Sequence, residues 1–231
     1  MRGSLAAVGF DFDHTLGVDN GLECRALFLL AADLGRPIPP EDQHRRTQLD
    51  GLLAAFRGGE FGLDEMLARF ADELGLRSVD PDAWRARCYA LVDAMVRPVP
   101  GASELIAALR RRAIPVAILT NGWSPLQQMK IARALGPHAV DTILVSDQLG
   151  VAKPELAAFD TLVAAFGALR ADIWYVGDNA RADVGGALAA GLRAIWFDAE
   201  GQTYPADLPP PTWSIHALRE LEAFIENTVA P

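Results

Sequence analysis

The chain has 231 residues, 51% of them hydrophobic, which is enough for one large domain or for a core with a smaller insert. Its formal net charge of −9 disfavours a nucleic acid polymer or an anionic membrane as a partner. A small anionic substrate is not excluded, because a metal ion and a few cationic side chains can reverse the field locally. Cys24 and Cys88 form neither a metal-type spacing nor a disulfide framework, and no stretch approaches the roughly 20 apolar residues of a membrane span. We therefore expect a cytoplasmic protein.

The first predicted element is an apolar run at 5–10, short enough for a buried strand, that ends at Asp11 and Asp13. Extended backbone would point both carboxylates to the same side, where like charges repel unless a cation or a shared proton relieves them. The pattern indicates a metal site, an acid/base pair, or both. The alternative is a polar turn in which the aspartates bond local backbone amides.

Residues from Gly17 to about Arg97 have a helical pattern, and no segment among them predicts a strand. The predicted helices are 22–34, 49–56, 64–74 and 82–96, and Glu41 and Asp42 suit the first turn of the helix that follows the break at 36–40. We predict an all-helical domain that is inserted after the first strand of a core domain. The helical domain and the two segments of the core domain are 17–97, 1–16 and 98–231.

After Gly101, predicted strands and helices alternate. The predicted strands are 115–119, 139–145, 172–176, 193–197 and 211–215. The predicted helices are 103–112, 125–135, 154–166, 182–190 and 216–225. Pro154 would occupy the first position of its helix, which proline favours. The alternation predicts an α/β fold with a parallel, doubly wound sheet.

Polar residues stand at the carboxyl ends of the predicted strands, and a parallel sheet would bring these ends to one edge. They are Asp11, Asp13, Thr120, Asn121 and Asp178, with Lys153 on a loop before a helix. Carboxylates, a hydroxyl group and a lysine suit a phosphate and a divalent metal. Structural alternatives exist for single residues: Lys153 as a solvated loop lysine, Thr120 as a helix cap and Asp183 as a helix-surface acid.

Four motifs follow one another in the chain: Asp11-x-Asp13-x-Thr15, Leu119-Thr120-Asn121, Lys153-Pro154 and Gly177-Asp178-x4-Asp183. In order and spacing they resemble the motifs of the haloacid dehalogenase superfamily of phosphohydrolases, over essentially the whole core. The resemblance implies a Rossmann-like core, and the helical insert is similar to the superfamily's C1 cap. The chain departs from the pattern at His14, where glycine or asparagine is commoner.

The resemblance implies a phosphatase that cleaves a small phosphomonoester through an aspartyl-phosphate. Asp11 would be the nucleophile, since an aspartate is ionised at neutral pH. Asp13 would protonate the leaving oxygen and later deprotonate the attacking water. The implied cofactor is Mg²⁺, held by the Asp11 carboxylate, the Asp13 backbone carbonyl and Asp178, because this ion prefers oxygen ligands.

The remaining motif residues have implied roles around the phosphate. The Thr120 hydroxyl and the Asn121 amide would hold phosphoryl oxygens, and Lys153 would supply a positive charge to them. Asp183 would orient Lys153 or the metal-bound waters. Asp13 favours phosphate chemistry over dehalogenation, since a halide leaves without a proton and dehalogenating members lack this aspartate.

Two alternatives stay open: a phosphomutase or other phosphotransferase of the superfamily, and a non-catalytic regulatory module on this fold. The expected partner is a small phosphorylated metabolite, such as a sugar phosphate, a nucleotide or a phosphoglycolate-like compound. The run Thr120-Asn121-Gly122-x4-Gln127-Gln128-x-Lys130 is similar to acylneuraminate-9-phosphatases and related pyrimidine nucleotidases. The sequence gives no oligomeric state.

Other polar and aromatic residues carry weaker expectations. The dispersed histidines are predicted to be structural: His14, His44, His138 and His216. Four arginines of the insert are either substrate contacts or solvated helix faces: Arg25, Arg45, Arg46 and Arg57. Trp123 either lines the pocket or packs in the core.

Overall fold

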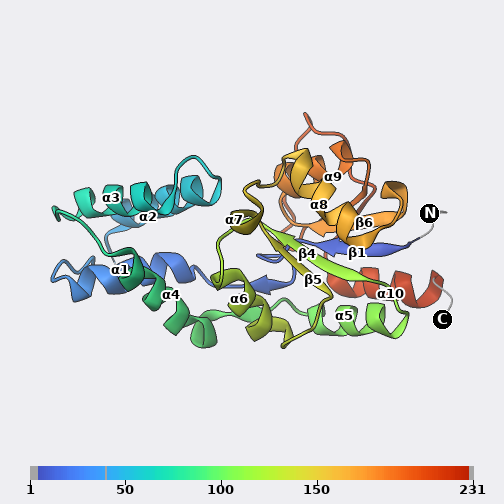
Figure 1. Cartoon of the computed structure of the whole chain (residues 1–231), viewed down its shortest axis with the longest axis horizontal. Coiled ribbons are helices and arrows are strands. Elements are labelled where there is room, and N and C mark those ends of the chain that lie inside the picture. Colours follow the sequence, from blue (N-terminus) through green and yellow to red (C-terminus); the bar gives the residue numbers. More distant parts are fainter. Residues whose placement is uncertain (1–4, 40, 229–231) are drawn as a thin grey trace. The chain divides into compact units, whose positions relative to one another are not determined.

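A six-stranded parallel sheet forms the centre of the fold (Figure 1). The structure is a computed structural model that describes residues 5–39 and 41–228. The strand order is β5-β4-β1-β6-β7-β8, and each neighbouring pair is parallel. The strands are β1 Ala7–Phe10, β4 Val116–Thr120, β5 Thr142–Val145, β6 Ile173–Gly177, β7 Arg193–Phe197 and β8 Trp213–Ile215. The predicted doubly wound α/β fold is confirmed.

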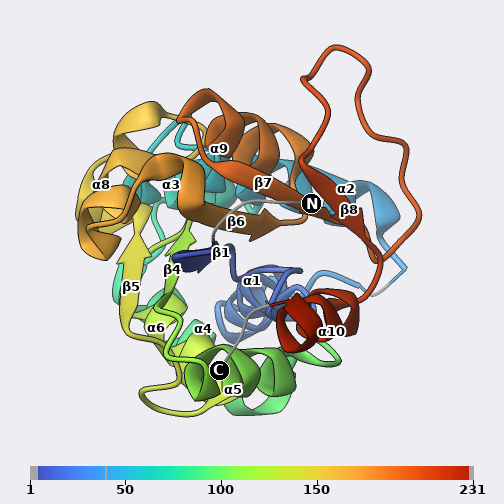
Figure 2. The ribbon, with the colours of Figure 1, turned by 90° about the vertical axis from the view of Figure 1, so that its right-hand side faces the viewer.

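Helices cover both faces of this sheet (Figure 2), with α5 and α10 on one face and α8 and α9 on the other. These helices are α5 Ala102–Arg111, α8 Leu156–Phe166, α9 Gly186–Ala189 and α10 Leu218–Thr228. Two further helices of the same part of the chain are α6 Leu126–Leu135 and α7 Ser146–Leu149. Because both faces are covered, all five residues of β4 are buried, and the strand is a continuous apolar run instead of an alternating one.

Large apolar side chains fill the layer between the sheet and α8. Phe159 and Leu162 of α8 are fully buried in a cluster that includes Tyr175 of β6. The rings of Phe159 and Tyr175 meet edge to face, with 5.2 Å between their centroids. Burial of each such side chain stabilises the fold by about 1.5–3 kcal/mol. This packing also fixes the Tyr175 ring, whose hydroxyl group lies 3.1 Å from Lys153 Nζ.

The chain divides into two compact units. The described residues up to Val18 and from Arg97 onward form the core unit, and Asp19–Val96 form the helical unit. The helices of the second unit are α1 Leu22–Asp33, α2 Gln43–Arg57, α3 Leu63–Glu73 and α4 Pro81–Met95. Among the described residues of this unit there is no strand. The boundaries lie within two residues of the predicted 17–97.

Helix α2 begins at Gln43, directly after Glu41 and Asp42, which were expected near its first turn, although the apolar pattern marks only 49–56. The side chain of Asp42 caps its first turn by accepting a hydrogen bond from the Arg45 N–H at 3.0 Å. Residues 43–48 face solvent for the most part, so no apolar periodicity marks the first turns. The cap, and not the hydrophobic pattern, determines where this helix starts.

A two-stranded antiparallel ribbon stands where the chain passes between the two units. Its strands are β2 Gly17–Val18 and β3 Arg97–Pro98, and Val18 is the register partner of Arg97. The sequence pattern predicted no strand from Gly17 to about Arg97, which was wrong at these two ends of the segment. Strands of two residues are too short to produce a periodic pattern.

In the core unit, the predicted first residues of one helix and one strand were wrong, and so was the predicted type of a second helix. Helix α8 begins at Leu156, so Pro154 precedes the helix and does not occupy its first position. Strand β5 begins at Thr142, because Arg110 donates to the carbonyl oxygens of residues 138 (2.9 Å) and 139 (3.4 Å) and holds that segment in a loop. The predicted helix 182–190 is a π-helical turn, Ala180–Gly185, followed by α9, since the Asn179 carbonyl accepts from the N–H groups of both residues 183 and 184.

In the part of the chain that the structure describes, none of the helices has the length and apolar character needed to cross a membrane.

Candidate active site

The site lies at the carboxyl end of β1, in the middle of the sheet. The chain first continues from β1 toward β4 and β5, and β6 then pairs with the opposite side of β1. Parallel sheets bind ligands beyond such a change of direction. Asp11 directly follows β1, Thr120 ends β4, and Asp178 directly follows β6, so the topology brings these predicted residues together within the core unit.

Lys153 is the centre of a buried polar network. Its Nζ lies 2.6 Å from Asp11 Oδ1 and 2.6 Å from Asp183 Oδ1. The third contact is the Tyr175 hydroxyl group, which in turn donates to the Leu119 carbonyl at 2.7 Å. With 3% of its side chain exposed, Lys153 is not a solvated loop lysine, and Asp183 at 1% is not a helix-surface acid.

Asn121 holds the segment that carries this lysine. Its side-chain oxygen accepts from the Lys153 N–H at 2.9 Å, and its side-chain NH₂ group donates to the Lys153 carbonyl at 3.0 Å. The predicted role of the Asn121 amide was to hold phosphoryl oxygens. In this structure the side-chain amide positions Lys153, and this clamp also explains why α8 begins only after Pro154.

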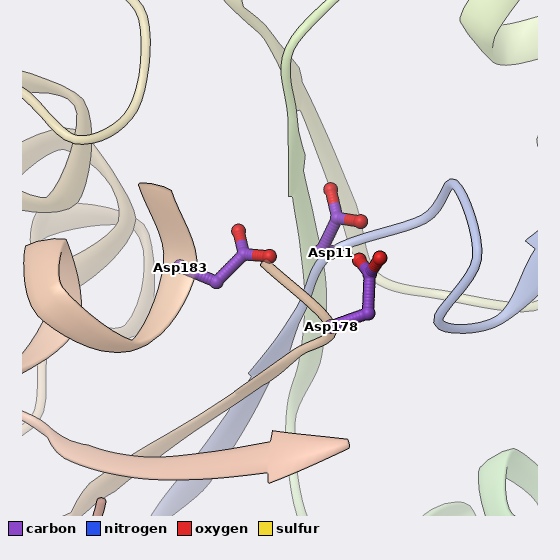
Figure 3. Close-up of side chains that lie close together, drawn as sticks. All are labelled: Asp11, Asp178 and Asp183. Atoms are coloured by element: carbon purple, nitrogen blue, oxygen red, sulfur yellow. The ribbon is translucent and has the colours of Figure 1, made fainter. Parts of the chain in front are cut away.

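Three carboxylates point toward one another at the site: Asp11, Asp178 and Asp183 (Figure 3). One carboxylate oxygen from each lies within 4.8 Å of those of the other two. Burial raises the pKa of Asp178 to about 6, and the nearby Asp183 charge adds to this shift. Burial also raises the pKa of Asp11 well above its usual range, although Lys153 opposes the effect. Without a bound cation, burial and neighbouring negative charge thus disfavour the ionised forms of both groups.

The donor set fits a hard divalent cation. All candidate ligands are oxygens, and one ammonium group faces three carboxylates, so a divalent ion would complete the charge balance. Asp183 already uses one oxygen for Lys153 and the other for the Asn179 N–H at 3.0 Å. Asp11 and Asp178 are therefore the carboxylates with capacity for a metal, and Asp183 has the contacts of a supporting residue.

Thr15 holds Asp178 in place, a role that the sequence analysis did not assign. Its hydroxyl group donates to Asp178 Oδ1 at 3.3 Å and accepts from the Asp178 N–H at 3.1 Å. The indole N–H of Trp196 donates to the Asp178 carbonyl at 2.9 Å. The position of Thr15 in the first motif was the only signal in the sequence for its role.

Position 177, directly before Asp178, has no space for a side chain larger than that of glycine. A Cβ atom on Gly177 would lie 2.4 Å from the Asp183 carboxyl carbon. The glycine and the two aspartates of the fourth motif are thus one packed unit, in which Asp183 lies across the backbone of Gly177.

His14 occupies a backbone position that explains why glycine or asparagine is commoner there in the superfamily. Its φ angle is 61°, in the left-handed region that glycine and asparagine adopt most readily. The turn is closed by the N–H groups of Leu16 and Gly17, both of which donate to the Phe12 carbonyl at 2.9 Å. Histidine is accommodated in this turn with its side chain exposed.

Two residues of α6 contact Asp13, and neither was assigned a role from the sequence. Gln127 donates to Asp13 Oδ2 at 2.9 Å, and Lys130 Nζ lies 2.5 Å from Asp13 Oδ1. Gln127 also donates to the Thr120 hydroxyl at 2.8 Å, so Thr120 is not a helix cap. The signal in the sequence was a pair of polar residues three apart on a helix after the second motif.

The other residues singled out from the sequence have no contact with these carboxylates among the described interactions. Trp123 is buried, as a core residue would be. His216 Nδ1 contacts the Asp198 carbonyl at 2.8 Å, and Arg46 lies over the Phe28 ring, 5.4 Å from its centroid. The contact of His216 is that of a structural residue, and the contact of Arg46 lies within the helical unit.

Known proteins resemble this chain in sequence and in fold. It is 36% identical over 140 residues to pyrimidine 5′-nucleotidase YjjG of Escherichia coli (strain K12), covering 59% of this chain and 61% of that protein. It is 39% identical over 99 residues to a phosphoserine phosphatase of Thermus thermophilus, covering 43% of this chain and 40% of that protein. The aligned parts thus span less than two thirds of these two relatives.

Full-length similarity exists to the HAD-hydrolase YfnB of Bacillus subtilis, which is 29% identical over 96% of each chain. Its crystal structure, with magnesium bound, superposes with a TM-score of 0.76 at 24% identity, covering 97% of this chain and 100% of that one. The L-2-haloacid dehalogenase of Xanthobacter autotrophicus shares the fold at a TM-score of 0.72 and 20% identity, over 97% of this chain and 100% of that one. The model of the haloacid dehalogenase-like hydrolase family matches residues 5–191. The chain therefore belongs to the haloacid dehalogenase-like hydrolase family.

Proposed function

We propose that this protein is a Mg²⁺-dependent phosphatase that hydrolyses a small phosphomonoester through an aspartyl-phosphate on Asp11. The observation that carries the proposal is the buried ammonium group of Lys153, 2.6 Å from Asp11 and next to Asp178 at the carboxyl end of β1. A cation beside a carboxylate that follows a central strand is suited to receive a phosphoryl group.

In the first step, an oxygen of Asp11 attacks the phosphorus atom and the bond from phosphorus to the leaving oxygen breaks. Asp13 gives its proton to that oxygen, so the product leaves as an alcohol. Lys153 contacts Oδ1 of Asp11, which leaves Oδ2 for the attack. The ammonium group also stabilises the charge on the phosphoryl oxygens, with the Thr120 hydroxyl as a further donor.

In the second step, a water molecule hydrolyses the aspartyl-phosphate. Asp13, now ionised, takes a proton from this water as it attacks phosphorus, and phosphate and the free Asp11 carboxylate result. The same carboxyl group therefore acts as acid and then as base, which returns the enzyme to its starting state.

Asp11, Asp178 and the backbone carbonyl of Asp13 would hold Mg²⁺. When bound, the ion supplies positive charge that draws the phosphate dianion to the acidic site. Without such charge, the phosphate would meet a cluster of carboxylates whose raised pKa values already reflect their crowding.

The substrate class is inferred from the relatives. Their names identify pyrimidine nucleotides, phosphoserine and glyceraldehyde 3-phosphate as substrates of those proteins. We infer a small phosphorylated metabolite as substrate here, with the helical unit Asp19–Val96 as the cap that recognises its non-phosphate part. The contacts that hold Asp13 favour phosphate ester cleavage over dehalogenation, because only the former needs a proton donor.

Hydrolysis of 4-nitrophenyl phosphate in the presence and absence of Mg²⁺ tests the proposal. We expect Mg²⁺-dependent release of phosphate, and a panel of phosphorylated metabolites then ranks substrates by kcat/KM. A well-folded protein that hydrolyses neither 4-nitrophenyl phosphate nor any member of the panel with Mg²⁺ would support the non-catalytic alternative.

A further inference from the structure

We propose that Gln127 and Lys130 of α6 are positioning residues that hold the Asp13 carboxyl group for proton transfer to the leaving oxygen. The inference rests on the proposed phosphatase function and goes beyond it. The four motifs of the chain contain neither residue.

The two side chains hold opposite oxygens of one carboxyl group. Gln127 Nε2 donates to Asp13 Oδ2 at 2.9 Å, and Lys130 Nζ lies 2.5 Å from Oδ1. The residues are three apart on α6, so they lie on the same face of the helix. Two contacts on two oxygens fix both the position of the carboxyl group and its rotation about the last side-chain bond.

Burial distinguishes this pair from surface polar residues. Gln127 and Lys130 are each 2% exposed, whereas 31% of the Asp13 side chain is exposed. A buried ammonium group is costly unless it is paired, so Lys130 has a strong preference for the geometry in which it meets Asp13. Lys130 Nζ also lies over the Phe12 ring, 5.8 Å from its centroid. The fixed partners are inside the fold, and the group that they hold faces outward.

Gln127 also ties Asp13 to the proposed phosphate-binding residues. The same Nε2 atom lies 2.8 Å from the Thr120 hydroxyl oxygen and 3.3 Å from the Asn121 carbonyl oxygen. The proton donor and the hydroxyl group that would contact the phosphoryl oxygens therefore share one anchor. This arrangement sets the distance between the transferred phosphoryl group and the acid that serves its leaving oxygen.

Gly122 provides the space for this anchor. Its φ angle is 148°, and a Cβ atom there would lie 2.8 Å from Gln127 Cγ and 2.9 Å from Gln127 Cδ. The glycine that follows Thr120 and Asn121 thus lets the Gln127 side chain lie directly against the backbone. A methyl group at this position would displace the Gln127 side chain and, because of the positive φ angle, would also strain the backbone.

The inference predicts a selective dependence on the leaving group. The 4-nitrophenolate ion leaves readily without a proton, whereas the phenolate ion is a poorer leaving group and depends more on protonation. The two aryl phosphates are otherwise alike in shape. A misplaced Asp13 should therefore slow the cleavage of phenyl phosphate more than that of 4-nitrophenyl phosphate.

The experiment measures kcat/KM for both aryl phosphates with Mg²⁺, because this constant reports the transfer of the phosphoryl group to Asp11. The variants are Lys130→Met and Gln127→Leu, with Asp13→Asn as the reference for complete loss of the acid. Gln128→Leu is the matched control, since Gln128 is on the same helix and bonds Ser124 and Gln148 instead. We expect the ratio of the two constants to change at least about tenfold in both test variants, in the direction seen for Asp13→Asn, and not in the control.

Gln127→Leu and Gly122→Ala keep the inference testable if Lys130→Met does not fold, because neither leaves a buried charge unpaired. Equal losses for the two substrates in folded variants, with a selective loss in Asp13→Asn, would overturn the positioning role and leave the phosphatase proposal intact. A wild-type protein that cleaves neither substrate with Mg²⁺ would overturn both. Recovery of the wild-type ratio in Lys130→Arg would support the need for a cation at this position.

Discussion

The Asn121 side chain forms hydrogen bonds with both the backbone N–H and the backbone carbonyl of Lys153, at 2.9 and 3.0 Å. The residue that ends the second motif thereby fixes the residue that begins the third. A loop lysine normally has much side-chain freedom, but here its backbone is held by a neighbouring loop and its ammonium group by two carboxylates. The positive charge of the site is thus held in advance of substrate binding, as electrostatic catalysis requires.

Asn121→Ala should lower both stability and activity. Each lost hydrogen bond leaves a backbone group of Lys153 without its partner, which costs about 1–3 kcal/mol. We expect a clear fall in the midpoint of urea unfolding without substrate, and a fall in kcat for 4-nitrophenyl phosphate. If Asn121 acted only as a phosphate ligand, KM would rise and the stability of the free protein would not change.

Asp11→Asn should abolish turnover and preserve the fold. The amide is nearly the same size as the carboxylate, and its oxygen can still accept from Lys153, but it is not a nucleophile for phosphorus. Mass spectrometry after reaction with substrate should find no phosphorylated enzyme. Asp160→Asn, at an exposed aspartate that pairs with Arg170, is the matched control and should retain full activity. Substantial turnover by pure Asp11→Asn protein would show that another group attacks phosphorus.

Removal of divalent metal ions should abolish phosphatase activity, and addition of Mg²⁺ should restore it. The clustered carboxylates suit a divalent cation, and an ion that bound only the folded protein would raise its melting temperature as the ion concentration increases. Differential scanning fluorimetry in EDTA and in increasing Mg²⁺ measures this shift independently of activity. Full activity after exhaustive chelation would exclude the metal-dependent mechanism.

Asp178→Asn should stabilise the metal-free protein near neutral pH and remove its response to Mg²⁺. Burial and the Asp183 charge raise the pKa of Asp178 from an ordinary value of 3.8 to about 6. Above pH 6 the group is ionised in both the folded and the unfolded state, and the folded state bears an electrostatic penalty of about 3 kcal/mol. Below pH 4 the group is protonated in both states, and the penalty vanishes.

Wild-type stability in EDTA should therefore fall as the pH rises from about 4 to 6, relative to that of Asp178→Asn. Urea unfolding of both proteins at pH 4 and pH 7.5 measures the difference. An asparagine variant that is less stable than the wild type at pH 7.5 would contradict the electrostatic account of this site.

Exchange of residues 19–96 for the corresponding segment of a relative with another substrate should change substrate preference and preserve phosphoryl transfer. The motif residues of the core unit can contact only the phosphate and its leaving oxygen, which all phosphomonoesters share. Ratios of kcat/KM across a metabolite panel measure the change, with 4-nitrophenyl phosphate as the reference substrate. An active chimera with the original preference would locate specificity in the loops of the core unit.

The convergence of Asp11, Thr120 and Asp178 followed from the sequence, because the alternation of strands and helices predicts a parallel sheet and the carboxyl ends of parallel strands lie at one edge. The contacts of α6 did not follow from it. Gln127 and Lys130 are polar residues in an otherwise ordinary helix, and the rotation that turns them inward depends on how α6 packs. Tyr175 is similar, since within a strand it reads as a core aromatic and nothing marks its hydroxyl group as a partner of Lys153.

Element boundaries depended on interactions between distant residues. Asn121 determines the path around Pro154 from 32 positions away in the sequence, and Arg110 holds the loop before β5 from 28 positions away. Local propensity contains no information about such contacts. The glycines were more informative in retrospect, because Gly122 and Gly177 each occupy a point where another side chain lies against the backbone.

The pairing of Val18 with Arg97 in the β2–β3 ribbon has a consequence for how the protein tolerates change in length. In the folding of the core unit, residues 19–96 form one long connection, and the ribbon brings its two ends together. The entropy lost on closing a flexible loop grows with the logarithm of its length, so a doubling of length costs only about 0.6 kcal/mol. Insertions in the loops between the helices of this segment should therefore have little effect on the pairing of β1 with β4 and β6.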